Sequence, residues 1–390
     1  MIEDATYSAA GRRIRARLVR TDVWQESTRD ILNFPSLVEL ADDRLFLGVR
    51  RQQHGTKRDE PVYYLLSEDG GATWSPAPPD MGFGNGGIGY LRDGSILRLH
   101  HNTVEADAKN WKRSQGLFHN IAQQGDPTFR LRRWTAGGEP IEEIHAKVEG
   151  IPWERASYQS YAKILDLPGG DLLTALEAHV GPIEPVPLDE HGWPQRFFRN
   201  FCVSIVRSGD GGRTWQLVTT FHRDRETSIY GMLDRPVDEG FAEADVVLLP
   251  EGGLLCVMRT GCYSPLFQSR STDGGQTWTR PESIGWPGVR PRLQSLPNGV
   301  LTCVSGRGSY GHPQTTHAIV SLDGAGAHWE YPFAFHTGPG CSYTQTMVRD
   351  GQLHVVYSHS DFTRPMGFHG LASQTINRAV IAVDDLPATA

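Results

Sequence analysis

The most regular feature of the chain is an apolar run, a tight turn and a second apolar run, repeated six times from end to end. The six segments are SLVELADDRLFLGV, IGYLRDGSILRL, AKILDLPGGDLLTAL, DVVLLPEGGLLCVM, RLQSLPNGVLTCV and TQTMVRDGQLHVV. Asp-Gly, Asn-Gly and Gly-Gly between apolar runs are strong β-hairpin signals, because these residues adopt the positive φ that tight hairpin turns require. The pattern therefore predicts an all-β protein.

The spacing of the hairpins indicates how they are assembled. Their turns are 51, 76, 83, 46 and 52 residues apart when counted at Asp43, Gly94, Gly170, Gly253, Gly299 and Gly351. A four-stranded propeller blade takes about 40–50 residues, so the 390 residues fit a six-bladed β-propeller, and seven blades remain compatible. Radial repetition protects the sheet edges, which allows one large domain. We predict a single domain over residues 1–390, with insertions near 102–155 and 180–200 in the two wide gaps.

A second repeat, S-x-D-G-G-x-T-W, occurs three times. The copies are SEDGGATW from Ser67, SGDGGRTW from Ser208 and STDGGQTW from Ser271. A degenerate fourth copy, SLDGAGAHW, begins at Ser321. Aspartate can accept hydrogen bonds from the backbone of its own turn, glycine supplies positive φ, and tryptophan packs the turn onto the strands. These aspartates are predicted to hold turns and not to catalyse.

The open ends of the hairpins carry polar residues. Because the two strands of a hairpin are antiparallel, the start of the first lies beside the end of the second. If the hairpins are equivalent, all six open ends meet at one mouth of the propeller, and the S-x-D-G-G-x-T-W turns lie on the opposite side. Six to nine residues after the turns are Arg50, His100, His179, Arg259, Arg307 and His359. Eight to ten residues before them are Asn33, Asn85, Tyr161, Glu243, Arg290 and Tyr343.

This ring of cations and hydrogen-bonding groups predicts an anionic ligand at the mouth. Arginine binds carboxylate or phosphate in a planar, bidentate manner. Like charge concentrated in a cleft also steers an anion inward.

The octapeptides match the Asp-box, or BNR repeat, of the sialidase-type β-propellers, and the chain resembles that family over most of its length. The resemblance implies cleavage of a glycosidic bond at a carboxylated sugar by an exo-glycoside hydrolase. In that family three arginines bind the carboxylate, a tyrosine is the nucleophile, a glutamate activates it and an aspartate is the acid/base. A neutral phenol suits this role, because the substrate carboxylate repels an anionic nucleophile.

Individual segments of the sequence resemble the family segments that contain particular site residues. FAEADVVLLPEGGLLCVMRTG resembles the Glu-strand-turn-strand-Arg segment of the family, which implies Glu243 as activator and Arg259 as carboxylate ligand. GPGCSYTQTMVRDGQLHVVY resembles the nucleophile segment and implies Tyr343. VLTCVSGRGS implies Arg307 as a second ligand, with Arg290 or Arg292 as rivals.

The chain departs from the family at two places. LNFPSL has Asn33 where the family has an arginine, and Arg50 or Arg51 could compensate. The loop RRQQHGTKRDEP offers His54 and Asp59 as the acid/base. The fold and the anionic sugar are therefore expected, while sialic acid itself stays open.

Two alternative functions fit the same scaffold. Some β-propeller polysaccharide lyases, including ulvan lyases and rhamnosyl-glucuronate lyases, use histidine and tyrosine, and β-elimination beside a uronate needs groups that move protons. In this alternative His100, His119 and Tyr161 move protons, while Asn85 and the arginines bind the uronate. The third hypothesis is a non-catalytic glycan-binding propeller, in which Trp111, Trp153 and Trp193 stack on sugars.

Composition and charge argue against nucleic acid and membrane as partners. The net charge is −7 without a basic run, which argues against nucleic acid, and no run of 18 apolar residues predicts a membrane span. The first residues lack a signal-peptide pattern, so we expect a cytoplasmic protein or a secreted one whose signal has been removed. Cys202, Cys256 and Cys303 lie in apolar runs and are expected to be buried thiols.

No cofactor or metal is expected. The chain has no phosphate-binding glycine loop, GxSxG elbow or HExxH pattern. The spacing of His100, His101 and His119 is not a recognised zinc pattern. The expected partner is an acidic glycan, either a sialoside or a uronate-containing saccharide.

Overall fold

The structure is a computed structural model in which the described elements are all β-strands, so the predicted all-β class is confirmed. Within the described residues no helix is long and apolar enough to cross a membrane. The described residues are 2–9, 12–26, 31–52, 62–78, 81, 83, 86–100, 128–151, 156–180, 197–223, 237–261, 264–306, 315–337, 343–360 and 374–385.

The described strands form five sheets, and the ten-stranded sheet contains two of the six mainly antiparallel units that follow one another along the chain. Unit 1 contains β3 (Ile31–Glu39), β4 (Leu45–Gln52), β5 (Val62–Ser67) and β6 (Ser75–Pro76). Unit 2 contains β7 (Gly86–Tyr90), β8 (Ile96–His100), β9 (Thr128–Trp134) and β10 (Pro140–Glu149). Unit 3 contains β11 (Ala156–Gln159), β12 (Leu165–Asp166), β13 (Leu172–Val180), β14 (Phe197–Ser208), β15 (Thr214–Phe221) and β16 (Val237–Gly240).

The second half of the chain repeats the arrangement. Unit 4 contains β17 (Ala242–Leu248), β18 (Leu254–Arg259), β19 (Pro265–Ser271) and β20 (Glu282–Pro287). Unit 5 contains β21 (Val289–Ser295), β22 (Leu301–Gly306), β23 (Thr315–Ser321) and β24 (Glu330–Thr337). Unit 6 contains β25 (Thr344–Arg349), β26 (Gln352–Ser360), β27 (Gln374–Asp385), β2 (Arg12–Glu26) and β1 (Ile2–Ala9).

Buried apolar clusters join each unit to the next and close the units into a ring. One cluster lies between each successive pair of units along the chain. The sixth lies between units 6 and 1, where Leu47 packs in one cluster with Val356 and Ile376. This closed ring of radial sheets is a β-propeller, as the hairpin pattern predicts.

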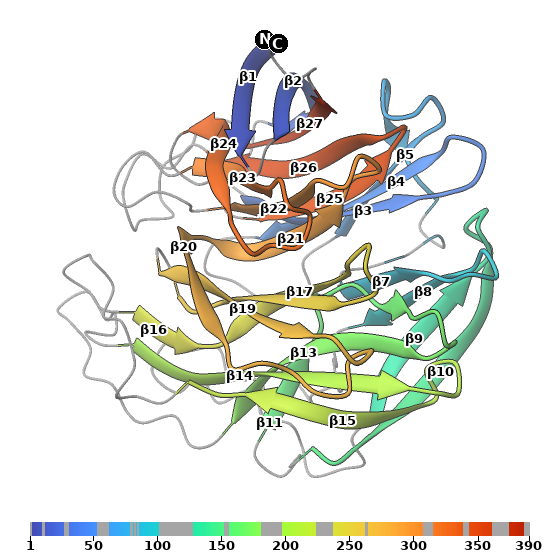
Figure 1. Ribbon diagram of the computed structural model, residues 1–390. Coiled ribbons are helices and arrows are strands. Elements are labelled where there is room, and N and C mark those ends of the chain that lie inside the picture. Colours follow the sequence, from blue (N-terminus) through green and yellow to red (C-terminus); the bar gives the residue numbers. More distant parts are fainter. Residues whose placement is uncertain are drawn as a thin grey trace, which may run out of the picture.

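The N-terminal segment completes unit 6. The strand β2 pairs antiparallel with β27, with Leu18 opposite Ile381, so the two ends of the chain lie together (Figure 1). Alternation along β2 buries Ile14 and Leu18 and leaves Arg17 exposed, as in a strand with one face against the core and the other in solvent. The closing strand thus comes from the opposite end of the chain, which the sequence analysis did not predict.

One predicted boundary is corrected by the strand assignment. Residues 128–149 belong to the range that we expected to be an insertion, but they include the whole of β9 and β10. These strands are the outer half of unit 2, and β10 joins unit 3 through a parallel pairing with β15. The hairpin pattern missed them because outer strands half-exposed to solvent lack continuous apolar runs.

The S-x-D-G-G-x-T-W turns hold themselves together as predicted. Ser271 Oγ donates to Asp273 Oδ1 at 2.8 Å, the Gly275 N–H donates to Ser271 Oγ at 2.8 Å, and the Thr277 N–H donates to Asp273 Oδ1 at 2.9 Å. The serine-to-aspartate bond recurs at Asp69, Asp210 and Asp323. These hydrogen bonds, above all from Thr73, lower the pKa of Asp69 to about 2.

These turns also lie on the predicted side. The Gly70 N–H donates to the carbonyl of Asp43 at 3.1 Å, so the turn of unit 1 rests against its β3–β4 turn, away from the open hairpin ends. The prediction for the cysteines holds as well, since Cys202, Cys256 and Cys303 are buried free thiols.

Candidate functional site

Three hairpins carry the same β-bulge at their open ends. Between Ala242 and Asp245 the strand β17 advances three residues while β18 advances two, and the same irregularity recurs in β21–β22 and β3–β4. An extra residue bends the strand and redirects its side chain. At the bulges Glu243 has φ 34° and Arg290 has φ 47°, the left-handed region that side-chain-bearing residues rarely adopt.

The register corrects two alignments of the sequence analysis. Opposite each other lie Ala242 and Arg259, Val289 and Gly306, and Asn33 and Arg50. Asn33 therefore corresponds to Ala242 and not to Glu243, and Arg307 follows the residue that corresponds to Arg259. The sequence count was off because it did not start from the equivalent residue of each turn. In unit 4 the turn closes at Gly253, whose carbonyl accepts a hydrogen bond from the Leu249 N–H. In unit 1 the equivalent bond, from the Leu40 N–H, ends at Arg44 and not at Asp43.

The two charged ends of the β17–β18 hairpin form a buried ion pair. The Arg259 Nη1 group donates to Glu243 Oε2 at 2.6 Å, and each residue is only 6% exposed. The same oxygen accepts from the Arg290 N–H at 3.1 Å. The Glu243 N–H in turn donates to Glu177 Oε2 on β13 at 2.9 Å. Units 3, 4 and 5 thus meet at Glu243.

The Arg290 guanidinium lies between two aromatic rings. Its Cζ is 5.0 Å from the ring centroid of Tyr161 and 5.5 Å from that of Tyr343, both within cation–π range. Burial raises the pKa of the Tyr161 phenol well above its usual value, and the carboxylates of Glu177 and Glu243 raise it further. The Tyr161 hydroxyl is therefore neutral at physiological pH.

A second buried network supports the first. The carboxylate of Asp245 is fully buried and accepts from Lys163 Nζ at 2.7 Å, from the Lys163 N–H at 2.9 Å and from the Leu293 N–H at 2.8 Å. Arg292 donates to the carbonyl of Tyr161 and lies 3.9 Å from Asp245. This network joins units 3, 4 and 5 and holds the backbone at Tyr161.

The interior near the site has an excess of positive charge. Among the described residues, five buried or half-buried cations, Arg98, Lys163, Arg259, Arg290 and Arg292, accompany three carboxylates, Glu177, Glu243 and Asp245. Sequence reasoning did not single out Glu177, Lys163, Asp245 or Arg98. A sequence signal for two of them was available: Arg98 in ILRL and Asp245 in ADVVLL are single charges inside apolar runs. Charged residues are almost never buried without a partner, so such a position indicates a buried ion pair or site.

The structure brings five predicted site residues together: Tyr161, Glu243, Arg259, Arg290 and Tyr343. Five others lie on described strands, but their side chains are outside the described residues: Asn33, Arg50, His100, His179 and His359. The remaining predicted residues are wholly outside the described residues: Asn85, Asp59, His119 and Arg307, together with His54, His101, Trp111, Trp153 and Trp193. Within the described ranges no group of three His, Cys, Asp or Glu side chains is arranged to hold a metal ion.

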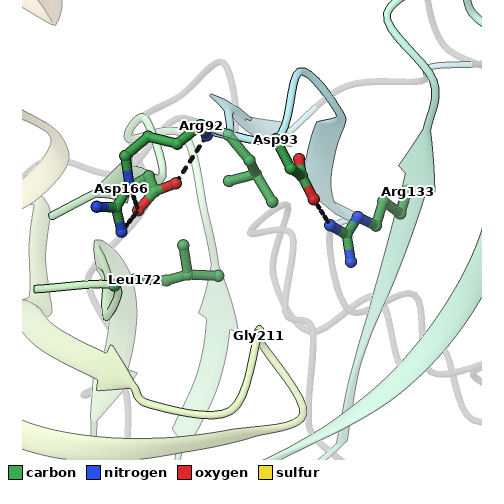
Figure 2. Close-up of a pocket in the computed structure, with 8 residues that line it drawn as sticks. Arg92, Asp93, Arg133, Asp166, Leu172 and Gly211 are labelled. Atoms are coloured by element: carbon green, nitrogen blue, oxygen red, sulfur yellow. Dashed lines mark hydrogen bonds and ion pairs between the residues drawn. The ribbon is translucent and has the colours of Figure 1, made fainter. Parts of the chain in front are cut away.

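A hollow of about 440 Å³ lies elsewhere, between the turns of units 2 and 3 (Figure 2). Arg92 Nε donates to Asp166 Oδ1 at 2.9 Å, and Arg133 pairs with Asp93, so the charged groups that line the hollow bind one another. It lies on the turn side of the propeller and includes none of the predicted catalytic residues. The buried charges at the mouth are therefore the better candidate site.

The fold and this site define the class: a β-propeller with a buried, cation-rich cluster at the open ends of its inner hairpins. Residues 192–355 match the family described as a BNR repeat-like domain, in agreement with the Asp-box resemblance. A search of curated proteins finds no match.

Solved structures share the fold. A protein of unknown function from Dyadobacter fermentans is 18% identical, with a TM-score of 0.67 over 95% of this chain and 99% of that one. The Hadza microbial sialidase Hz136 is 17% identical, with a TM-score of 0.59 over 90% of this chain and 65% of the sialidase. The Trypanosoma rangeli sialidase is 13% identical, with a TM-score of 0.54 over 90% of this chain and 55% of that one. The chain is thus similar to sialidase-type β-propellers and spans just over half to two thirds of the two sialidases.

Proposed function

We propose that the protein is a carbohydrate-active enzyme that cleaves a glycosidic bond at a carboxylated sugar, as a sialidase-like exo-glycoside hydrolase. The observation that carries the proposal is the Glu243–Arg259 ion pair beside Arg290, which lies between Tyr161 and Tyr343. The excess of buried positive charge suits an acidic sugar. The strained backbone at Glu243 and Arg290 points the same way, since such strain concentrates at functional sites.

The proposed reaction uses a neutral nucleophile. Tyr343 attacks the anomeric carbon, Glu243 takes the phenol proton, and the glycosidic C–O bond breaks as the Tyr–sugar bond forms. An acid, for which Asp59 and His54 are the candidates, protonates the leaving oxygen. Water then hydrolyses the covalent intermediate and restores Tyr343. Arg259 and Arg290 bind the sugar carboxylate throughout.

The proposal is tested by incubating the protein with sialosides and with uronate-containing glycans. Release of an acidic sugar without ultraviolet absorbance from a new double bond is the expected result. The Tyr343→Phe variant should lose activity by roughly 10³-fold or more, because it lacks the nucleophile. Tyr90→Phe, which changes a phenol on the turn side of the propeller, should keep it. Full activity in Tyr343→Phe would contradict the nucleophile assignment.

A uronate lyase is the second candidate, and the position of Tyr161 favours it. Its neutral phenol lies against the same Arg290 guanidinium and beside two carboxylates. In this function Tyr161, with His100 and His119, moves the protons of β-elimination. A product with a new conjugated double bond, lost in Tyr161→Phe and retained in Tyr343→Phe, would replace the hydrolase with the lyase. Binding of an acidic glycan without turnover would instead support the glycan-binding propeller.

A further inference from the structure

The strand β13 carries a carboxylate where its pattern would continue with an apolar side chain. Leu173 and Ala175, earlier on the same strand, pack in the apolar cluster between units 3 and 4. Because side chains alternate between the two faces of a strand, Glu177 extends from the same face, towards unit 4. Only 9% of Glu177 is exposed, so its carboxylate needs polar partners in this interior.

One such partner is the backbone of the β-bulge in β17. Glu177 Oε2 accepts a hydrogen bond from the Glu243 N–H at 2.9 Å. Glu243 has φ 34°, a conformation that persists only where the surroundings impose it. A buried N–H without an acceptor would make the bulge still less favourable. The Glu177 carboxylate therefore stabilises the bulge in its strained conformation.

The bulge in turn determines where the Glu243 side chain points, because an extra residue redirects the side chain. From this backbone the Glu243 carboxylate reaches Arg259 Nη1 at 2.6 Å. It also accepts from the Arg290 N–H, at the equivalent bulge of unit 5, at 3.1 Å. Twice in succession, a carboxylate of one unit thus holds the bulge of the next unit. A displacement of the Glu243 backbone would displace its carboxylate.

We propose that Glu177 is a positioning residue: through its hydrogen bond to the Glu243 N–H it fixes the Glu243 carboxylate where it takes the proton of Tyr343. This inference rests on the proposed function, in which Glu243 activates Tyr343. The role requires an acceptor oxygen at this reach, because the bond is made to a neutral N–H. The negative charge of Glu177 strengthens the bond but is not essential to it.

Two variants separate reach from charge. Glu177→Gln keeps an acceptor oxygen at the same reach and removes the charge, whereas Glu177→Asp keeps the charge and withdraws the oxygens by about 1.5 Å. With the acidic sugar substrate, kcat should fall by roughly 10²-fold in Glu177→Asp, because misplacing a catalytic group by about 1 Å has an effect of this size. Glu177→Gln should keep kcat within about fivefold of the native value.

The Michaelis constant and a matched control make the test specific. KM should change little in both variants, because the arginines that bind the sugar carboxylate are unchanged. Glu251→Asp makes the same shortening at an exposed glutamate in the turn of the β17–β18 hairpin and should leave kcat unchanged. If Glu177→Asp does not fold, Glu177→Met, which has a similar length and no oxygen, replaces it with the same expected loss.

Three kinetic results would overturn the proposal. An unchanged kcat in Glu177→Asp would show that reach does not matter. A loss in Glu177→Gln as large as the loss in Glu177→Asp would show that the charge is what matters. A loss that lies in KM and not in kcat would assign Glu177 to substrate binding.

A second measurement does not depend on sugar cleavage. Deuterium exchange of the Glu243 N–H, followed by NMR of the full chain, reports on the hydrogen bond itself. We expect exchange to be about tenfold faster in Glu177→Asp than in Glu177→Gln. Equal exchange in the two variants would refute the positioning role even if the chain cleaves a sugar. Faster exchange in Glu177→Asp, with no sugar cleaved by the native chain, would support the contact and refute only the proposed function.

Discussion

Glu243 and Arg259 are 16 residues apart in the sequence, and their side chains meet at 2.6 Å across the open end of one hairpin. The bulge in β17 makes this contact possible, because the extra residue places Glu243 in the left-handed region. The same bulge in β21 presents the Arg290 N–H to Glu243. The same β-bulge, repeated in the neighbouring units 4 and 5, therefore assembles the centre of the site.

The first prediction concerns this ion pair. Arg259→Leu should lower the free energy of unfolding by about 3 kcal/mol, because it leaves the Glu243 carboxylate buried without its charged partner. Urea unfolding measures the change. The double variant Glu243→Leu/Arg259→Leu should recover part of the loss, because two apolar side chains need no counter-charge. A double variant that loses the sum of both single effects would contradict this explanation.

The second prediction concerns the fully buried Asp245. Asp245→Asn keeps the shape of the side chain but removes the charge opposite Lys163 and Arg292, so we expect a loss of about 3 kcal/mol in the free energy of unfolding. The control is Asp384→Asn, since Asp384 pairs with Arg17 at 2.8 Å and both side chains are about half exposed. That surface pair should contribute less than about 1 kcal/mol. Equal losses in the two variants would contradict a special role for burial.

The third prediction separates backbone strain from crowding at two glycines. Gly275 has φ +88°, and a Cβ there would lie 2.6 Å from Leu173 Cδ1 and 2.9 Å from Leu254 Cδ1. Gly252 has φ +86°, and a Cβ there meets nothing within 4 Å. Both alanine variants should lose about 1 kcal/mol in the free energy of unfolding, because alanine disfavours the left-handed conformation. Gly275→Ala should lose about 1–3 kcal/mol more, because its methyl group overpacks the core. Chemical denaturation of the two variants checks the difference, and similar losses would contradict it.

The fourth prediction is a loss of stability in acid. His317 is buried, and burial lowers its pKa to about 4 from an ordinary value of 6.5. Between these values the unfolded chain binds a proton that the folded chain does not. Stability is therefore complete above pH 6.5 and falls as the pH decreases towards 4, by up to about 1.4 kcal/mol per pH unit and about 3 kcal/mol in total.

The measurement is urea unfolding at a series of pH values. His354 contributes in the same direction, because burial and the nearby Arg378 lower its pKa to about 4. His317→Leu should reduce the slope between pH 6.5 and 4 whatever its effect on stability at neutral pH. An unchanged slope in that variant would show that other groups cause the acid sensitivity.

Local chemistry determined much of the fold from sequence. Six apolar hairpins with glycine-rich turns predicted an all-β propeller, and the S-x-D-G-G-x-T-W copies predicted self-contained turns, because each feature depends on residues within a few positions of one another. Glu243 and Arg259 could also be paired in advance, since the two ends of one hairpin are antiparallel neighbours. The register was off by one residue at Asn33 and Arg307, because counting from a turn depends on which residue closes it.

Only the tertiary structure decided which distant groups meet. The pairing of β2 with β27, the stacking of Tyr161 and Tyr343 on Arg290 and the contact of Lys163 with Asp245 all join different parts of the chain. Each contact exists because the ring closes and brings the inner strands of separate units to one axis. Sequence alone contains the charges, but ring closure buries them together and so determines which of them share a site.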